Sequence, residues 1–308
     1  MGDKRPDYLT LHDSGELQQR ADLARTALDE CITCPRECRA NRLEADPCYC
    51  AGGKRAIVCS ASPHFGEERP LVGSGGSGTI FFAGCNLGCI FCQNYEISHL
   101  RQGREVTAGE LANIMMRLQR QGCHNINFVS PSHFVPQILE ALVPAVEEGL
   151  KLPLVYNSGG YDTLATLRLL DGVIDIYMPD AKYADPEVAE VLSGAPDYPD
   201  VMRAALTEMH RQVGDLQIGD DNVATRGLLV RHLVLPEGLA GTAEVMQFIA
   251  SLSANTYVNV MAQYRPCHEA FEDTRISRRI TREEYREAVQ ATLDAGLHRL
   301  DERPLAML

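Results

Sequence analysis

Residues 81–94 of this 308-residue chain read FFAGCNLGCIFCQN. They join a short apolar run to Cys85, Cys89 and Cys92 in a C-x3-C-x2-C spacing. Thiolates are soft ligands that suit zinc and iron–sulfur clusters, and a saturated 4Fe-4S cluster takes four of them. Three close thiolates would leave one iron without a protein ligand, and an open metal position is where a substrate binds. The two glycines inside the motif would let the backbone turn sharply around a cluster.

Two other interpretations of this cysteine triplet stay open. One is a zinc site completed by a distant ligand, and the other is a set of buried structural cysteines. The spacing, the apolar run before it and the glycines together favour a cluster loop at the end of a strand.

Downstream of the motif, short apolar runs alternate with amphipathic helical patterns. Two of the helical patterns begin with a capping box, at Thr107 with Glu110 and at Thr281 with Glu284. Strands that alternate with helices imply parallel βα units. Six units are too few for an eight-stranded barrel, so we predict an α/β fold with a partial (βα)6 barrel; a doubly wound sheet is the alternative. The predicted strands cover residues 79–83, 125–129, 152–157, 173–178, 228–235 and 257–262.

The first 72 residues differ from the rest, and we predict that they form a cysteine-rich cap on a barrel of residues 73–308. An amphipathic helix over about residues 14–28 precedes six cysteines in a stretch with little periodicity. A run of glycine and serine over residues 73–78 indicates either a linker or a tight approach of two backbone segments.

The composition restricts the compartment and the partners. The chain has 11 cysteines, nine of them before residue 93, and neither a secretory signal nor an apolar run that could span a bilayer. We therefore expect the reducing cytosol, where clustered cysteines favour metal binding or catalysis over disulfides. The net charge of −13 argues against nucleic acid or an anionic membrane as the main partner.

Four cysteines of the cap have the spacing of metal ligands. The first three follow a C-x2-C-x3-C pattern and the fourth lies twelve residues on, which predicts a second metal, either zinc or an iron–sulfur cluster. Cys48 is an alternative fourth ligand, and unliganded thiols in a docked cap are the alternative to a metal. Such a site could relay electrons or clamp the structure. The four predicted ligands are Cys31, Cys34, Cys38 and Cys50.

The triplet, with Phe91 directly before its third cysteine, resembles the cluster loop of radical S-adenosylmethionine (SAM) enzymes. The resemblance implies a partial barrel and a 4Fe-4S cluster on Cys85, Cys89 and Cys92, with SAM bound to the fourth iron beside Phe91. It also implies that an electron cleaves SAM to a 5′-deoxyadenosyl radical, which takes a hydrogen atom from a substrate. The implied partner is an electron donor such as flavodoxin or ferredoxin.

The resemblance extends over about residues 31–285 and points to uncharacterised proteins similar to pyruvate formate-lyase activating enzyme. It implies a monovalent-cation site near Asp180 and, as substrate, a glycine of a partner enzyme. Taken alone, an Asp-x-Lys pair such as Asp180 and Lys182 usually lies in a solvated loop. Of two adjacent strand residues such as Arg231 and His232, one faces inward and the other outward. Their places at successive strand ends favour a cofactor site. The residues implied to surround SAM are Ser130, Asn157, Ser158, Gly159, Asp180, Lys182, Arg231 and His232.

The chain departs from this family pattern after the second strand. Activating enzymes usually carry Gly-Gly-Glu there, to bind the amino group of SAM, whereas residues 129–133 read VSPSH. Ser130 and the backbone could still accept hydrogen bonds from that ammonium, but no carboxylate is present. The alternative functions are radical SAM modification of a peptide, nucleotide or small metabolite, and a non-catalytic zinc or iron–sulfur protein.

Overall fold

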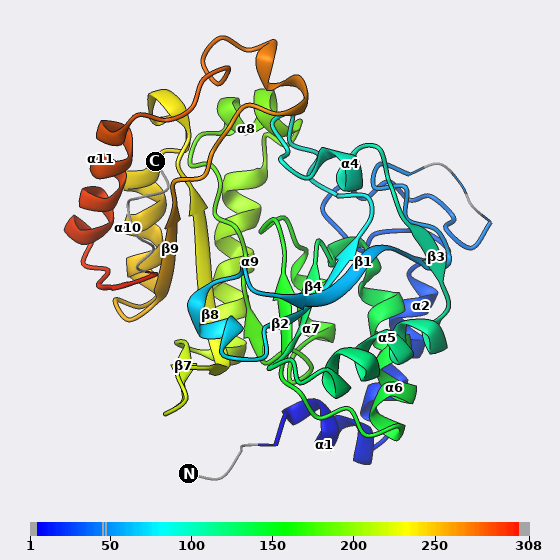
Figure 1. Cartoon of the computed structure of the whole chain (residues 1–308). Coiled ribbons are helices and arrows are strands. Elements are labelled where there is room, and N and C mark those ends of the chain that lie inside the picture. The colour runs from blue at the N-terminus through cyan, green and yellow to red at the C-terminus, as the bar shows by residue number, and fades with distance from the viewer. Residues whose placement is uncertain (1–4, 45, 47, 302–308) are drawn as a thin grey trace.

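The computed structural model describes residues 5–44, 46 and 48–301, and its centre is a curved, mostly parallel sheet (Figure 1). Six parallel strands lie next to one another and each overlaps one of the six predicted strands. The predicted α/β partial barrel is therefore confirmed. In their order across the sheet, the strands are β2 (Ser77–Phe82), β4 (Ile126–Val129), β5 (Leu154–Asn157), β6 (Ile176–Tyr177), β8 (Ala224–Leu233) and β9 (Tyr257–Met261).

Further strands, which the sequence did not reveal, extend the sheet. β1 (Ala56–His64) pairs antiparallel with β2 and with β3 (Arg104–Val106). β7 (Gln217–Ile218) pairs antiparallel with β8, and β10 (Arg299–Leu300) lies parallel to β9. β1 falls within the predicted cap of residues 1–72, so the barrel sheet already begins at residue 56. Its inward and outward residues do not alternate regularly, which explains why the pattern was missed.

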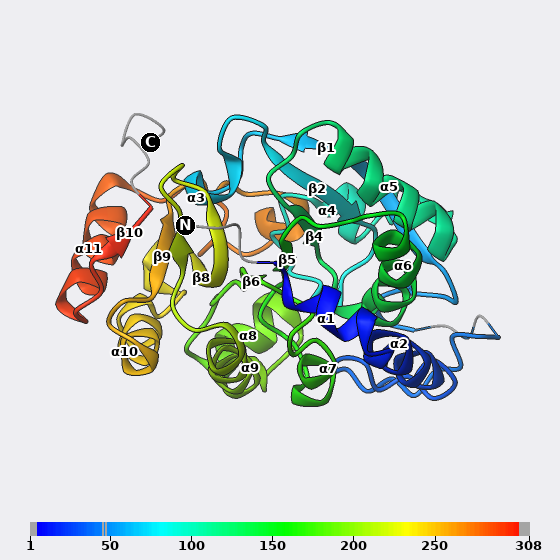
Figure 2. The same cartoon turned by 90° about the horizontal axis from the view of Figure 1, so that it is seen from below.

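Helices cover the outer face of the barrel strands (Figure 2). The capping boxes predicted at Thr107 and Thr281 are both present, and each threonine hydroxyl accepts a hydrogen bond from the N–H of the glutamate three residues on. Apolar residues of α5, such as Leu111, Met115 and Leu118, are buried against the sheet. The covering helices are α5 (Ala108–Arg120), α6 (Val135–Glu147), α7 (Leu164–Leu169), α9 (Tyr198–Val213), α10 (Thr242–Leu252) and α11 (Arg282–Asp294).

Short helices gather at the end of the barrel to which the strands point. α4 (Tyr95–Ser98) follows the cysteine triplet, and α8 (Pro186–Ser193) follows β6 (Figure 1). The 3-10 turns η1 (Ser132–Phe134), η2 (Pro236–Gly238) and η3 (His268–Phe271) each follow a barrel strand. None of the helices in the described residues is both long and apolar enough to cross a membrane.

The cap packs on the outside of the barrel. Its helices are α1 (Asp7–Asp13) and α2 (Glu16–Thr26), and α2 contacts α6. The Tyr8 hydroxyl donates a hydrogen bond to the Leu152 carbonyl at 2.9 Å. Beyond α2, the described part of residues 27–55 contains no helix or strand, and it carries the cap cysteines back to the barrel.

The barrel interior changes from apolar to polar along its axis. Val155 and Leu229 form an interior cluster with Leu71, which belongs to the short helix α3 (Arg69–Val72). Side chains two residues apart on a strand share a face, so Asn157 and Arg231 lie one step further toward the strand ends. Apolar side chains thus fill the interior at the level of Val155 and Leu229. Polar side chains line it toward the strand ends, where the loops begin.

The glycine and serine run of residues 73–78 is a tight backbone approach and not a linker. A Cβ atom on Gly75 would lie 2.0 Å from the Gly122 carbonyl oxygen, and one on Gly78 would lie 2.5 Å from the Asn125 carbonyl oxygen. The Gly75 N–H donates to His124 Nε2 at 3.0 Å. The run therefore holds the start of β2 in close contact with the loop before β4.

We predict that Gly75→Ala lowers the free energy of unfolding by about 2 kcal/mol, because the new methyl group must displace a backbone carbonyl. The matched control is Gly109→Ala in α5, where a Cβ atom meets nothing within 4 Å. That control should keep or raise the stability by about 0.5–1 kcal/mol, since alanine is the better helix former. Urea unfolding of both variants measures the difference; equal midpoints for Gly75→Ala and the wild type would contradict the close approach.

Candidate active site

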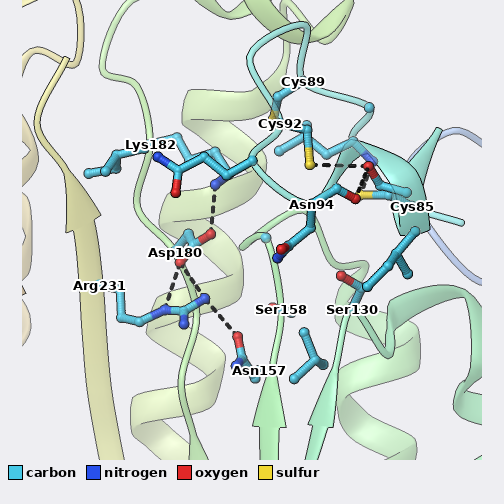
Figure 3. A pocket seen from close by; sticks show the side chains of 18 of the residues that line it. Cys85, Cys89, Cys92, Asn94, Ser130, Asn157, Ser158, Asp180, Lys182 and Arg231 are labelled. Carbon is cyan, nitrogen blue, oxygen red and sulfur yellow. Dashed lines mark hydrogen bonds and ion pairs between the residues drawn. The ribbon is translucent and has the colours of Figure 1, made fainter. Parts of the chain in front are cut away.

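An open cavity of about 220 Å³ lies at the end of the barrel to which the parallel strands point (Figure 3). The loop after β2 forms one wall, and the ends of β4, β5, β8 and β9 together with the residues after β6 form the others. Parallel barrels place their sites at this end, because the loops that leave the strands meet there. The lining includes Cys85, Cys89, Cys92, Phe91, Ser130, Asn157, Ser158, Gly159, Asp180, Lys182 and Arg231.

The cysteine triplet lies on a loop that turns at two glycines. Gly84 and Gly88 have φ angles of 79° and 65°, which favour glycine over residues with a Cβ atom. A Cβ atom on Gly84 would also lie 2.2 Å from the Cys50 carbonyl oxygen of the cap. The loop thus reverses direction where the cap presses against it, and all three cysteines line the cavity.

The thiols of Cys85 and Cys92 accept hydrogen bonds from their own loop and from the short helix after it. The Leu87 N–H donates to Cys85 Sγ at 3.3 Å, and the Ser98 hydroxyl donates to Cys92 Sγ at 3.1 Å. Burial raises the pKa of Cys85 and raises that of Cys92 to about 11. Both are therefore neutral thiols at pH 7 unless a cationic group replaces their protons, as a metal cluster does.

The donor set fits a cluster better than a single ion. Among the described residues, no three His, Cys, Asp or Glu side chains stand close enough to hold one metal ion. Four iron atoms at the corners of a cube separate their thiolate ligands more widely than a single zinc ion, whose bonds to sulfur are about 2.3 Å long. Three thiols on one loop that face the same open cavity are available as the protein ligands of such a cluster.

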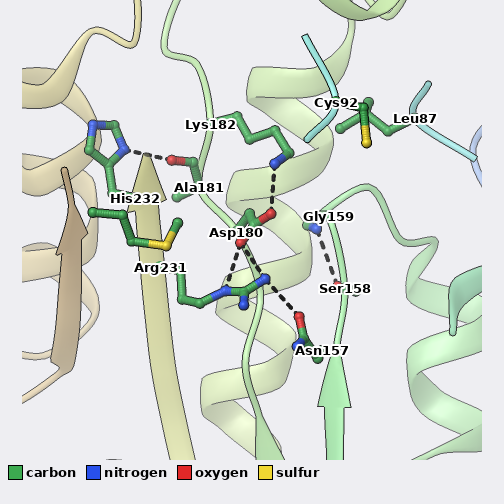
Figure 4. A network of polar contacts seen from close by, with 12 residues as sticks. Leu87, Cys92, Asn157, Ser158, Gly159, Asp180, Ala181, Lys182, Arg231 and His232 are labelled. Carbon is green, nitrogen blue, oxygen red and sulfur yellow. Dashed lines mark hydrogen bonds and ion pairs between the residues drawn. The ribbon is translucent and has the colours of Figure 1, made fainter. Parts of the chain in front are cut away.

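A partly buried network of charges crosses the strand ends opposite the cysteines (Figure 4). Lys182 Nζ lies 2.6 Å from one oxygen of Asp180, and Arg231 Nε donates to the other at 2.8 Å. Arg231 Nη2 also donates to Asn157 Oδ1 at 2.7 Å. Burial opposes ionisation of Asp180, but the cations of Arg231 and Lys182 outweigh it and hold its pKa below the ordinary value. Lys182 and Arg231 outnumber the one carboxylate among the residues that line the cavity, and Glu67 and Glu68 lie near Arg231 outside that lining. The two cations that line the cavity suit an anionic group of a ligand.

The serines of the predicted site are held by the backbone and by a carboxylate. Ser130 has a φ of 56°, which is uncommon for a residue other than glycine, and its N–H donates to the Asn157 carbonyl at 2.9 Å. The Ser158 hydroxyl donates to the buried Asp162 at 2.7 Å. Asp162 was not predicted, because a single aspartate five residues after a strand carries no distinguishing signal.

Phe91 is held by two aromatic contacts, and Gly159 by a hydrogen bond to its carbonyl. The ring of Phe91 packs edge to face against Tyr264 and Tyr183, with centroids 5.8 and 6.4 Å away. The hydroxyl of Tyr198 donates to the Gly159 carbonyl at 2.9 Å. Tyr264 is therefore a packing residue behind Phe91, and it does not line the cavity.

His232 lies outside the cavity, although it was predicted beside Arg231. Successive strand residues face opposite ways, so Arg231 points inward and His232 points toward α10. Its Nδ1–H donates to the Ala181 carbonyl at 2.6 Å, and its Nε2 lies 2.9 Å from the Thr242 hydroxyl. Burial lowers its pKa to about 4, so the ring is neutral at pH 7. His232 supports the Asp-x-Lys segment from behind (Figure 4).

A buried arginine lies beside the cap cysteines. Arg42 is fully buried, with its Nη1 3.6 Å from Cys31 Sγ and its Nε donating to the Gly52 carbonyl. Cys48 Sγ and Cys50 Sγ lie 3.7 Å apart. Cys31, Cys34 and Cys50 are buried, whereas Cys38 is exposed. The described residues thus place the predicted ligands in one neighbourhood without closing them around an ion.

Several cavity residues were not predicted as site residues. Asn94 and Gln93 directly follow the triplet, Ser98 ends α4, and Met261 ends β9. Their residue types are common in loops and strands, so position in the fold was the only signal. Gln93 Nε2 donates to the Gln263 carbonyl at 2.9 Å, which ties the loop after the triplet to the loop after β9.

Comparisons with known proteins identify the class. Residues 79–211 match the family model described as the radical SAM superfamily. The chain is 33% identical over 282 residues to the uncharacterized protein MJ0674 of Methanocaldococcus jannaschii, an alignment that covers 89% of this chain and 77% of that protein. The chain belongs to the radical SAM superfamily, whose cofactors are a 4Fe-4S cluster and SAM. The crystal structure of methylornithine synthase (PylB) superposes with a TM-score of 0.45 and 14% identity, covering 97% of this chain and 82% of that one.

We predict that His232 makes stability fall on acidification. The unfolded chain protonates this histidine below about pH 6.5, whereas the folded chain resists protonation down to about pH 4, so its contribution is complete above pH 6.5 and is lost between those values. The loss should reach about 2 kcal/mol at pH 5, because each pH unit corresponds to about 1.4 kcal/mol. Urea unfolding from pH 7 to 5 measures it. His232→Gln should be less stable at pH 7 but fall less steeply; parallel slopes would contradict the assignment.

Proposed function

We propose that this chain cleaves SAM reductively at a 4Fe-4S cluster held by Cys85, Cys89 and Cys92. The 5′-deoxyadenosyl radical formed in this way would take a hydrogen atom from a substrate. The observation that carries the proposal is that three thiols of one loop face a cavity whose opposite wall is the network of Asp180, Lys182 and Arg231. A zinc or iron–sulfur storage protein would have no use for that polar wall.

The charges of the cavity suggest how SAM is held. The net positive charge of Lys182 and Arg231 around Asp180 suits the carboxylate of SAM. Asp180 is the only carboxylate among the cavity-lining residues, and both its oxygens are engaged. We therefore assign the amino group of SAM to Ser130 and the carbonyls around it, in place of the absent Gly-Gly-Glu. A monovalent cation at Asp180 would first need Lys182 or Arg231 to release an oxygen.

The first candidate substrate is a glycine of a partner enzyme, as in glycyl-radical activating enzymes. The Asp180-Ala181-Lys182 segment supports it, because it occupies the strand end that the resemblance to that branch implies. A peptide, nucleotide or small metabolite is the alternative. A flavodoxin or ferredoxin in the reducing cytosol is the proposed electron donor, and the 11 free thiols agree with that compartment. A co-purifying protein that gains a stable organic radical signal would separate the two substrate classes.

We also propose a second metal centre in the cap, on Cys31, Cys34, Cys38 and Cys50. Three of these thiols are buried, and the buried cation of Arg42 beside Cys31 would offset part of the negative charge of a thiolate site. Cys48 lies close enough to Cys50 to replace it as ligand. Zinc would have to draw four sulfurs together around one ion, whereas an iron–sulfur cluster would hold them further apart.

We predict that anaerobically reconstituted protein forms 5′-deoxyadenosine from SAM when it is reduced with dithionite. Cys85→Ala should lower formation to the level of a protein-free control, because three ligands are needed to hold the cluster. The matched control is Cys59→Ala, which removes an exposed thiol on β1 and should leave product formation unchanged. Chromatography of the products measures both, and a wild type that holds iron but makes no 5′-deoxyadenosine would contradict the proposal.

We predict that metal analysis separates the two metals proposed for the cap. If the cap holds a cluster, the wild type should carry about eight irons per chain and the double variant Cys31→Ala/Cys34→Ala about four. If the cap holds zinc, the iron content should stay at about four in both proteins while one zinc is lost in the variant. A wild type with about four irons and no zinc would show that the cap cysteines bind no metal.

A further inference from the structure

Arg36 of the cap reaches across to the cluster loop and binds its backbone. Its Nε donates to the Asn86 carbonyl at 2.8 Å and its Nη2 to the Leu87 carbonyl at 3.0 Å. The same guanidinium donates to the Ser193 and Gly194 carbonyls at the end of α8. Four backbone carbonyls from two separate segments are thus held by one side chain.

The two peptide groups that Arg36 contacts are those whose N–H groups face Cys85. The Asn86 carbonyl and the Leu87 N–H belong to one peptide group, and this N–H donates to Cys85 Sγ at 3.3 Å. The Leu87 carbonyl and the Gly88 N–H belong to the next, and the Gly88 N–H is also hydrogen bonded to Cys85. Each peptide group therefore accepts from Arg36 at its oxygen and donates to the same sulfur at its nitrogen.

Tyr49 completes this arrangement from the other side. Its hydroxyl donates to the Leu87 carbonyl at 3.2 Å, and its ring stacks on the Arg36 guanidinium with 4.0 Å between the guanidinium carbon and the ring centroid. Among the described residues, no carboxylate oxygen lies within 4 Å of the Arg36 guanidinium. The positive charge is therefore available to the carbonyls it contacts.

We propose that Arg36 is a positioning residue that raises the reduction potential of the cluster held by Cys85. This inference rests on the proposed function, because it requires a cluster at that cysteine. A guanidinium that binds a peptide oxygen polarises the peptide group and makes its N–H a stronger donor, as in any chain of cooperative hydrogen bonds. Stronger N–H···S hydrogen bonds and a nearby positive charge both favour the reduced cluster, which carries one more electron.

The position of Arg36 in the sequence connects this effect to the cap. Arg36 lies between Cys34 and Cys38, and Tyr49 lies between Cys48 and Cys50. Both side chains that contact the Leu87 carbonyl are therefore placed by the two cysteine motifs of the cap. The cap thus acts on the cluster loop through its backbone, whichever metal its thiols hold.

The test is a redox titration of the reconstituted cluster, followed by electron paramagnetic resonance of its reduced form. We expect Arg36→Gln to shift the midpoint to a more negative potential. At the wild-type midpoint, the ratio of reduced to oxidised cluster should fall about tenfold, which equals about 59 mV for one electron. Tyr49→Phe should shift the midpoint in the same direction but less, because it removes one donor to the Leu87 carbonyl and leaves Arg36 in place.

Arg39→Gln is the matched control. Arg39 lies in the same cysteine loop, but its exposed side chain pairs at the surface with Glu30. It should leave the midpoint unchanged. If Arg36 had only a structural role, Arg36→Gln would lower the melting temperature. The midpoint potential of the molecules that retain their cluster would then stay at the wild-type value.

The outcomes are distinguishable from failure of the proposed function. If the wild type binds no cluster, the proposed function fails, and the inference fails with it. If Arg36→Gln and Tyr49→Phe keep about four irons at the triplet and titrate like the wild type, only the inference is overturned. Should Arg36→Gln fail to hold a cluster, Tyr49→Phe decides alone: a shift toward negative potential supports the inference and an unchanged midpoint overturns it.

Discussion

The carboxylate of Asp180, held between Lys182 and Arg231, is the interaction on which the open end of the barrel depends. β6 is only two residues long, and beyond it backbone hydrogen bonds still join Asp180 to Ser158 and Ala181 to Arg231. The contact from Asp180 to Arg231, and from Arg231 to Asn157, joins the ends of three neighbouring strands by side chains. Burying three charges costs desolvation energy, and replacing such a group by apolar residues often leaves stability unchanged. The role in binding SAM that we propose for Lys182 and Arg231 would account for a charged network at the cavity.

The second feature of the site is the contact between the cap and the cluster loop. Gly84 has no room for a side chain because the Cys50 carbonyl lies against it, and Leu87 accepts hydrogen bonds from Arg36 and Tyr49. A loop that must hold three ligands in a fixed arrangement needs its backbone supported from behind. Here that support comes from a segment more than thirty residues earlier in the chain. The cap therefore supports the backbone of the loop that carries Cys85, Cys89 and Cys92.

Local sequence signals predicted those features whose physical cause is local. The capping boxes at Thr107 and Thr281 depend on residues three apart, and both are present. The strand ends carrying Asn157 and Asp180 were found because apolar runs stop at polar residues, whereas Arg231 was predicted from the family resemblance. β1 was missed because its pairing with β2 is irregular and its faces are mixed. His232 was placed in the cavity with Arg231, although one residue along a strand reverses the direction of the side chain.

The sequence by itself determined the class of the protein and its cofactor loop. The alternating strand and helix patterns predict the partial barrel, and the C-x3-C-x2-C triplet resembles the cluster loop of radical SAM enzymes. Both signals can be found in the sequence because spacing and periodicity are properties of neighbouring residues. Only the tertiary structure decided that Asp162 holds Ser158, that Leu71 closes the barrel interior and that Arg36 grips the loop around Cys85. The contacts of Leu71 and Arg36 join residues far apart along the chain, through packing in one case and through backbone carbonyls in the other. Every residue has such a carbonyl, so no residue pattern announces which of them a distant side chain will bind.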